Sequence, residues 1–130
     1  DIIYISNHGG RQLDFGLGTT EVLTEIINTT KDHCEIYVDG GFYRGTDILK
    51  AICLGATAIG LGRLYGYGMA ADGVDGIIRV LEILEEEIIN AMANLGVTTL
   101  SELNKDLICK SEPVVEPTAF SAFLPVKISH

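Results

Sequence analysis

The sequence has few basic residues, and this shortage limits its partners. Nine lysines and arginines stand against 18 aspartates and glutamates, so the 130 residues carry a formal net charge of −9. A negative surface repels nucleic acid and anionic membranes, because both carry the same sign of charge. We therefore expect neither as the main partner, and the hydrophobic content of 47% predicts a folded domain.

The sequence also lacks paired cysteines and long apolar runs. Cys34, Cys53 and Cys109 form no CxxC pair, and an odd number closes no complete disulfide framework, so we expect reduced thiols and a cytoplasmic location. No apolar run reaches the roughly 18 to 20 residues that span a bilayer, which predicts no transmembrane segment. The sequence starts with Asp1 and enters a strand at once, so we expect a cut end there.

Short apolar runs alternate with helical patterns along the sequence. The runs at 2–5 and 35–38, and a weaker one at 58–61, predict strands that are buried on both faces. Apolar residues recurring at steps of three and four predict helices, which cover 19–28, 46–54 and about 74–95. Thr99 and Glu102 have the spacing of a capping box and predict a last short helix that ends near Ile108.

Alternating strands and helices are typical of an α/β fold with a parallel sheet and right-handed crossovers. The order alone does not separate an open sheet from a barrel. In barrels the chemistry collects on the loops that leave the carboxyl ends of the strands, and a polar, glycine-containing cluster follows each of the three predicted strands. We therefore expect residues 1–108 to form three βα units and residues 109–130, which contain all three prolines, to form an irregular C-terminal arm.

The first cluster, SNHGGRQLD, follows the first strand and contains His8 and Arg11. An imidazole titrates near neutral pH and can remove a proton, while a guanidinium binds a carboxylate through two parallel hydrogen bonds. The pair suits a small ligand with an acid group beside an exchangeable proton. A structural loop with a satisfied histidine and a surface arginine is the alternative.

The second and third clusters follow the other two strands and are rich in glycine. Gly40 and Gly41 lead into a helix, whose first turn offers unpaired N–H groups to a phosphate. Gly62 and Arg63 add a second glycine turn with a cation. In barrels the last two strand loops form the expected phosphate site, so the two clusters together favour a phosphate-bearing ligand over simple tight turns.

Three segments in this order, SNHGGRQLD, DGG-x-x-RGTD-x-x-KA-x-x-LGA and G-x-GR, resemble the FMN-dependent 2-hydroxy acid oxidases and dehydrogenases, which include glycolate oxidase, lactate oxidase and mandelate dehydrogenase. The resemblance covers residue 1 to about residue 108. It implies a TIM (β/α)8 barrel of which this chain supplies the last three units. It also implies an oxidoreductase that converts a small (S)-2-hydroxy acid to the 2-oxo acid.

The resemblance assigns roles to individual residues. His8 would be the base that takes a proton from the substrate, and Arg11 would hold the substrate carboxylate. No metal site is implied. FMN would contact Ser6, Asp39, Gly40, Gly41, Tyr43, Arg44, Gly62 and Arg63.

Two positions depart from the family pattern. Tyr43 stands where the family has the first of two arginines, and Leu64 stands where it has a proline. A tyrosine can donate one hydrogen bond to a phosphate but brings no charge. The departures put the affinity for flavin and the shape of the last turn in question.

The family also needs residues from earlier strands, which this chain does not contain. Three of eight strands would leave open edges and an uncovered interior, so we expect the N-terminal part of the same barrel as a partner, active only in combination. A homo-oligomer, with a tetramer as the common family form, is also implied. The alternatives are another phosphate-binding barrel enzyme, of isomerase or nucleotide dehydrogenase type, and a non-catalytic assembly module.

Several other polar residues are expected to lie outside the site. His33, His130 and Lys50 should be solvated surface residues. Tyr65 and Tyr67 are expected either to line a pocket or to pack against the barrel end. Four acidic residues on the long helix should form a solvated face rather than a metal site, and these are Glu82, Glu85, Glu86 and Glu87.

Overall fold

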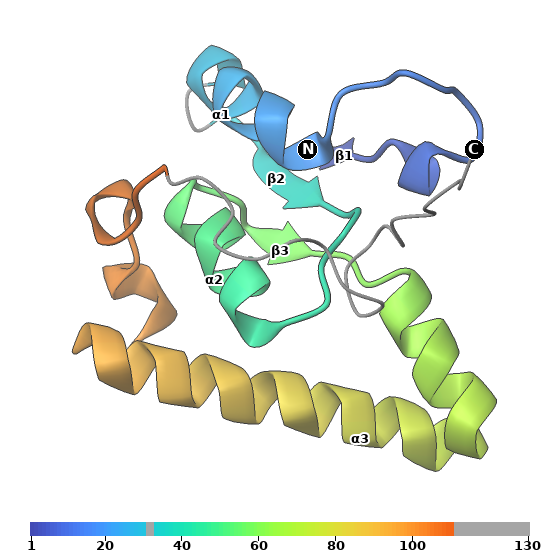
Figure 1. The fold of residues 1–130 in the computed structure, drawn as a ribbon. Helices are drawn as coiled ribbons and strands as arrows, with labels where there is room; N and C mark the ends of the chain where they lie inside the picture. The colour runs from blue at the N-terminus through green and yellow to red at the C-terminus, as the bar shows by residue number, and fades with distance from the viewer. Residues whose placement is uncertain (31–32, 111–130) are drawn as a thin grey trace, which may run out of the picture.

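The computed structural model describes residues 1–30 and 33–110, which form a three-stranded parallel sheet flanked by helices (Figure 1). The strands lie in the order β1 (Ile2–Ile5), β2 (Glu35–Val38) and β3 (Ala58–Ile59). The predicted positions of β1 and β2 are confirmed. The third strand ends two residues earlier than predicted, although the amide of Gly60 still donates to the carbonyl of Val38 at 2.8 Å.

Two helices connect the strands and a long third helix follows them. They are α1 (Thr19–Thr30), α2 (Gly45–Cys53) and α3 (Arg63–Leu95). The first extends two residues beyond the prediction, and the second is displaced by one residue. Figure 1 shows α3 along the side of α2 that faces away from the sheet.

The helix predicted from about residue 74 to residue 95 is confirmed as the second segment of α3, but the sequence did not predict the first segment, which begins at Arg63. Asp72 and Gly73 have non-helical backbone angles and break α3 into two segments. The first segment is rich in glycine, which disfavours helix in isolation. Gly68 allows the two segments to approach each other, because an added Cβ on it would lie 2.6 Å from the carbonyl oxygen of Gly76.

The predicted last helix is instead two 3-10 turns, η2 (Leu100–Glu102) and η3 (Lys105–Leu107). The capping box of η2 is confirmed, since Glu102 accepts the backbone N–H of Thr99 at 2.9 Å. Leu103 then turns to an extended conformation and is buried against α2. Burial of this apolar side chain outweighs continuation of the helix.

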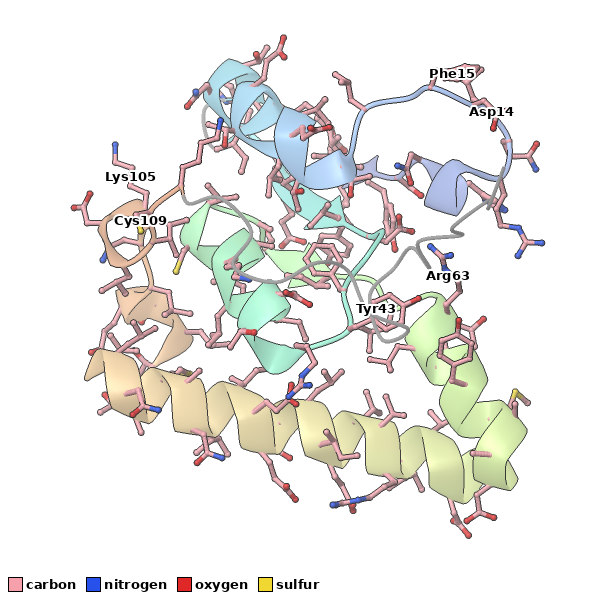
Figure 2. The ribbon with its side chains drawn as sticks, viewed as in Figure 1. Asp14, Phe15, Tyr43, Arg63, Lys105 and Cys109 are labelled. Carbon is pink, nitrogen blue, oxygen red and sulfur yellow. The ribbon has the colours of Figure 1, made fainter. Side chains whose placement is uncertain are left out.

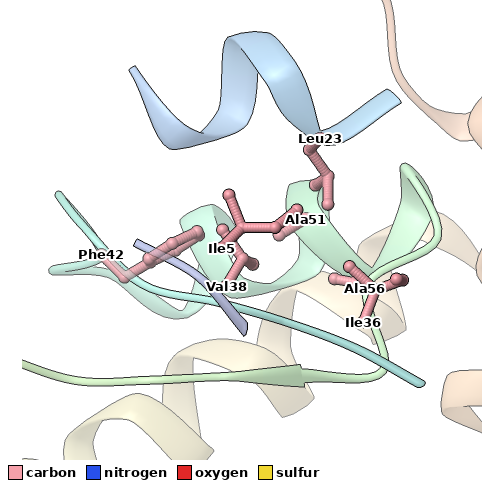
Figure 3. Close-up of a cluster of buried hydrophobic side chains, with 7 residues drawn as sticks. All are labelled: Ile5, Leu23, Ile36, Val38, Phe42, Ala51 and Ala56. Atoms are coloured by element: carbon pink, nitrogen blue, oxygen red, sulfur yellow. The ribbon is translucent and has the colours of Figure 1, made fainter. Parts of the chain in front are cut away.

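The core lies between the sheet and the two connecting helices (Figure 3). Side chains alternate along a strand, and Ile5, Val38 and Ile36 all point to the face that α1 and α2 cover. Leu23 from α1 and Val38 are fully buried. Burial of each such aliphatic side chain contributes roughly 1.5 to 3 kcal/mol.

The opposite face of the sheet stays accessible within residues 1–30 and 33–110. Ile2 is 56% exposed and Tyr4 53% exposed, and Tyr4 pairs in register with the half-buried Tyr37. Parallel sheets are normally covered on both faces, so the prediction of strands buried on both faces is wrong for this part of the chain.

Sequential strand order, with both crossover helices packed on one face, is the winding of a TIM barrel. A doubly wound sheet would place helices on both faces. Of the predicted C-terminal arm, Cys109 and Lys110 lie in neither helix nor strand, while residues 111–130, with the prolines and His130, lie outside the described residues. Within the described part, no helix is long and apolar enough to cross a membrane.

Candidate active site

The loops that follow the three strands meet around one cavity of about 400 Å³. A volume of this size suits a small-molecule ligand. Nine of the ten residues that the sequence assigned to the site line it, and Arg44 is the exception. The lining consists of Ser6, His8, Gly9, Arg11, Asp39, Gly40, Gly41, Phe42, Tyr43, Gly62, Arg63, Tyr65 and Gly66.

His8 is presented at the end of β1 by a short turn, η1 (His8–Gly10), that local hydrogen bonds define. The backbone N–H of His8 donates to Ser6 Oγ at 3.1 Å, and that of Gly9 donates to Asn7 Oδ1 at 3.0 Å. His8 has a φ of 52°, in the left-handed region, which costs a residue with a Cβ about 1 kcal/mol or more. The fold therefore holds an exposed imidazole at the cavity in a conformation that this residue does not favour.

Asp39 stands at the end of β2 with an unpaired oxygen. Its backbone is fixed, because its N–H donates to the carbonyl of Ile5 at 3.1 Å and its carbonyl accepts the hydroxyl of Thr19 at 2.5 Å. Its Oδ1 is buried and has no hydrogen-bond partner among the described residues. Buried polar atoms are nearly always hydrogen-bonded, so this oxygen is a ready acceptor for a ligand hydroxyl group.

Tyr4 lies next to this carboxylate, and the sequence analysis missed it. Burial raises the pKa of the Tyr4 phenol, and the charge of Asp39 raises it further. The Tyr4 hydroxyl packs where a side chain at Gly60 would begin, so a Cβ there would collide with it. The glycine that opens the G-x-GR segment was the available signal for this close approach.

Arg63, the first residue of α3, brings a guanidinium to the glycine turns. An added Cβ at Gly9 would lie 3.6 Å from its Nη2, so the guanidinium lies beside the loop that follows β1. It also lines a second cavity of about 630 Å³, which shares Gly40 and Gly41 with the first. Figure 2 shows Arg63 and Tyr43 together near the start of α3.

Tyr43 is half-buried, and its ring packs beside the ring of Tyr67. Their ring centroids are 6.4 Å apart, with the planes tilted by 34°. Burial raises the pKa of Tyr43, the nearby Arg63 opposes this, and Tyr67 adds to the rise, so the phenol stays protonated and can donate a hydrogen bond. Of the two tyrosines after Arg63, Tyr65 lines the cavity. Tyr67 does not line it, but its ring packs beside that of Tyr43, which does.

Arg44 turns away from the cavity toward α3. Its Nη2 lies 2.6 Å from Glu87 Oε1, while the backbone N–H of Gly45 donates to Glu87 Oε2 at 2.7 Å. The expectation of a solvated Glu87 is therefore wrong, because its carboxylate, on α3, binds the Arg44 side chain and the Gly45 amide at the start of α2. Glu82 and Glu86 do lie on the surface, where both pair with Arg79.

The remaining residues behave more simply. Phe42, which follows Gly41, is buried in the core and also lines the cavity. The sequence motif did not predict either role. Lys50 is an exposed lysine that pairs with Asp47 at 3.4 Å. His33 lies in an exposed bend away from the cavity. Within residues 1–30 and 33–110, no group of three or more His, Cys, Asp or Glu is placed to hold a metal ion.

The lining fits a flavin mononucleotide. The unpaired oxygen of Asp39 would accept a hydroxyl group of the sugar chain. Arg63 and the two glycine turns offer a cation and close backbone approach to a phosphate. His8 and Arg11 line the same cavity.

Comparison with known proteins places the chain in a family. Residues 1–110 match the FMN-dependent dehydrogenases. L-lactate dehydrogenase (cytochrome) of Saccharomyces cerevisiae is 48% identical over 111 residues, which cover 82% of this chain and 19% of the yeast protein. 2-Hydroxyacid oxidase 2 of Homo sapiens is 44% identical, with 82% and 30% covered.

A solved structure shows the same similarity in three dimensions. A soluble mutant of the membrane-associated (S)-mandelate dehydrogenase from Pseudomonas putida superposes with a TM-score of 0.78 at 41% identity, over 82% of this chain and 30% of that one. The chain thus spans between about a fifth and a third of the length of the relatives it matches. It belongs to the family of FMN-dependent dehydrogenases, whose cofactor is FMN.

Proposed function

We propose that this chain supplies the last three βα units of a TIM (β/α)8 barrel that oxidises a small (S)-2-hydroxy acid to the 2-oxo acid with FMN. The observation that carries the proposal is the shared cavity, which His8 and Arg11 line together with Asp39 and Arg63. A proton acceptor, a carboxylate clamp and a flavin site within one cavity meet the requirements of this reaction.

The protein residues have separate tasks in this reaction. Arg11 binds the substrate carboxylate through two hydrogen bonds and fixes the orientation of the 2-carbon. An imidazole nitrogen of His8 accepts the proton of the 2-hydroxyl group. FMN, when bound, takes up the two electrons that leave the substrate as hydride or its equivalent. Asp39, Gly40, Gly41, Gly62 and Arg63 hold that cofactor in place.

The accessible face of the sheet supports the proposal that a companion polypeptide completes the barrel. Ile2 and Tyr4 are exposed on the face that a closed barrel would bury. The five earlier βα units, in the same polypeptide or a separate one, would cover it. We extend the proposal to a homo-oligomer, a tetramer as in the family. We extend it also to a cytoplasmic location, which suits the three free cysteines.

The test is reconstitution of the whole barrel. This chain is coexpressed with the five N-terminal units of a relative, and the purified complex is analysed by intact mass and visible spectrum. We expect two polypeptides with bound, yellow FMN that is bleached by L-lactate, glycolate or (S)-mandelate without oxygen.

Two outcomes would contradict the proposal. A complex that binds FMN but is bleached by none of a panel of 2-hydroxy acids would favour a different phosphate-binding barrel enzyme. A chain that folds stably alone and binds no flavin would favour an assembly module.

A further inference from the structure

The phosphate end of the cavity is poorer in positive charge than the sequence suggests. Two consecutive loops build this end, and each carries one arginine, Arg44 and Arg63. Arg44 is held by Glu87 at 2.6 Å and does not line the cavity. Of these two guanidinium groups, only that of Arg63 can approach an anion between the glycine turns.

A pair of phenols stands where a second cation would be expected. Tyr43 lines the cavity from the loop after β2, and Tyr67 comes from the second turn of α3. Tyr67 lies four residues after Arg63, so both side chains emerge on the same side of the helix. The ring centroids of Tyr43 and Tyr67 lie 6.4 Å apart, so the Tyr67 ring packs beside that of Tyr43.

We infer that this chain binds the cofactor phosphate with one guanidinium, that of Arg63, and one neutral donor, the Tyr43 hydroxyl, which Tyr67 positions. The identity of the ligand rests on the proposed function. The assignment of Tyr43 and Tyr67 rests on their own geometry and on the engagement of Arg44 by Glu87. Tyr67 is then a positioning residue that acts through Tyr43.

A neutral donor has measurable consequences for affinity. A hydrogen bond from a charged donor to a phosphate is roughly twice as strong as one from a neutral donor. The phosphate group should therefore add less to binding here than in a cradle with two guanidinium groups. The advantage of FMN over riboflavin, which has no phosphate, measures this contribution directly.

The central experiment uses Tyr43→Arg in the reconstituted barrel, with flavin binding followed by fluorescence quenching of FMN and of riboflavin. We expect the variant to bind FMN about tenfold more tightly, with a steeper loss of affinity in salt. Affinity for riboflavin should not change. Met69→Arg adds the same charge at an exposed position of α3 that lines neither cavity, and it should leave both affinities unchanged.

Two milder variants test the hydrogen bond without adding charge. Tyr43→Phe should weaken FMN binding by about fivefold and leave riboflavin binding unchanged, since one neutral hydrogen bond is lost. Tyr67→Ala removes the ring that packs beside Tyr43, so it should give a smaller loss that is again restricted to FMN.

The outcomes separate this inference from the proposed function. Failure of the wild-type barrel to bind either flavin would overturn both. Binding of FMN with an affinity that Tyr43→Arg and Tyr43→Phe leave unchanged would overturn the inference alone. Equal effects of these variants on FMN and riboflavin would overturn it too, because they would place Tyr43 away from the phosphate.

Discussion

The polar groups at the carboxyl edge of the sheet differ in their hydrogen bonding from those on the flank formed by α2, α3 and η2. On the flank, Glu87 accepts both Arg44 and the amide of Gly45, and Glu102 accepts the amide of Thr99. At the edge, Asp39 keeps a buried oxygen without a partner in the described residues. One region satisfies its hydrogen bonds within the chain, and the other leaves groups for a ligand.

Backbone conformation follows the same division. The turn that carries His8 places a residue with a Cβ in the left-handed region. On the flank, left-handed conformation falls at Gly96, which caps α3 and bears no such cost. Strain and unpaired acceptors both collect at the edge, as expected where structure serves binding rather than stability.

The largest effect should come from His8→Gln at the edge. Loss of the proton acceptor should slow anaerobic reduction of bound FMN by L-lactate about a thousandfold, the usual scale of general-base catalysis. Stopped-flow absorbance of the flavin band measures the rate. His33→Gln is the matched control, because His33 is exposed and lies away from the cavity. Reduction of His8→Gln at the wild-type rate would rule out His8 as the base.

Asp39→Asn should lower the affinity for FMN without lowering the stability of the flavin-free barrel. Loss of the charged acceptor should weaken FMN binding about tenfold. The flavin-free barrel should become no less stable, because a neutral amide costs less to bury than a carboxylate whose Oδ1 is buried without a partner in the described residues. Flavin titration and thermal melting of the flavin-free protein measure the two effects. Asp75→Asn, an exposed change on α3, should alter neither, and equal loss of stability and affinity in Asp39→Asn would make Asp39 structural.

Glu87→Gln should give the reverse result on the flank. It weakens the ion pair with Arg44 and the hydrogen bond from Gly45, so urea unfolding of the barrel should show a loss of about 1 to 2 kcal/mol. FMN affinity should change little. Glu86→Gln, which removes only an exposed pairing with Arg79, should cost less than about 0.5 kcal/mol. A larger effect on FMN binding than on stability would break the division between the two regions.

The smallest effect concerns Glu102 and pH. Hydrogen bonds from Thr99, and then from Thr98, lower the pKa of the Glu102 carboxyl below its usual 4.5. The capping contact therefore stabilises the fold above that pH, and its contribution is lost as the pH falls through the lowered pKa. Glu102→Gln should reduce the melting temperature slightly at neutral pH and not in acid. Glu85→Gln, at an exposed site, should show no such pH-dependent difference.

Local patterns predicted much of the fold. The short apolar runs of β1 and β2 and the helical spacing of α1 identified these elements, because each pattern lies in neighbouring residues. The segment after Arg63 was missed because Gly68 lowers helix propensity, and its contact with Gly76 exists only after folding. The uncovered sheet face was expected only from the family resemblance, because the apolar run that contains Ile2 and Tyr4 predicts burial when it is read by itself.

The candidate site was recognised from motifs rather than from folding rules. The segments after β1, β2 and β3 named nine residues that the structure gathers around one cavity. Their roles remain predictions. The sequence did not show that Glu87 engages Arg44, because that ion pair joins residues more than forty positions apart. It also could not show that Asp39 retains an unpaired oxygen, which depends on the surrounding fold.

A crystal structure of the reconstituted barrel with FMN and oxalate, an acid that cannot be oxidised in this way, would test the central claim most directly. The account predicts the flavin phosphate beside Gly41 and Arg63, with Arg11 bound to the oxalate through two hydrogen bonds. An imidazole nitrogen of His8 should lie within hydrogen-bonding distance of the same oxalate. His8 and Arg11 pointing into separate spaces, with no phosphate between the glycine turns, would contradict it.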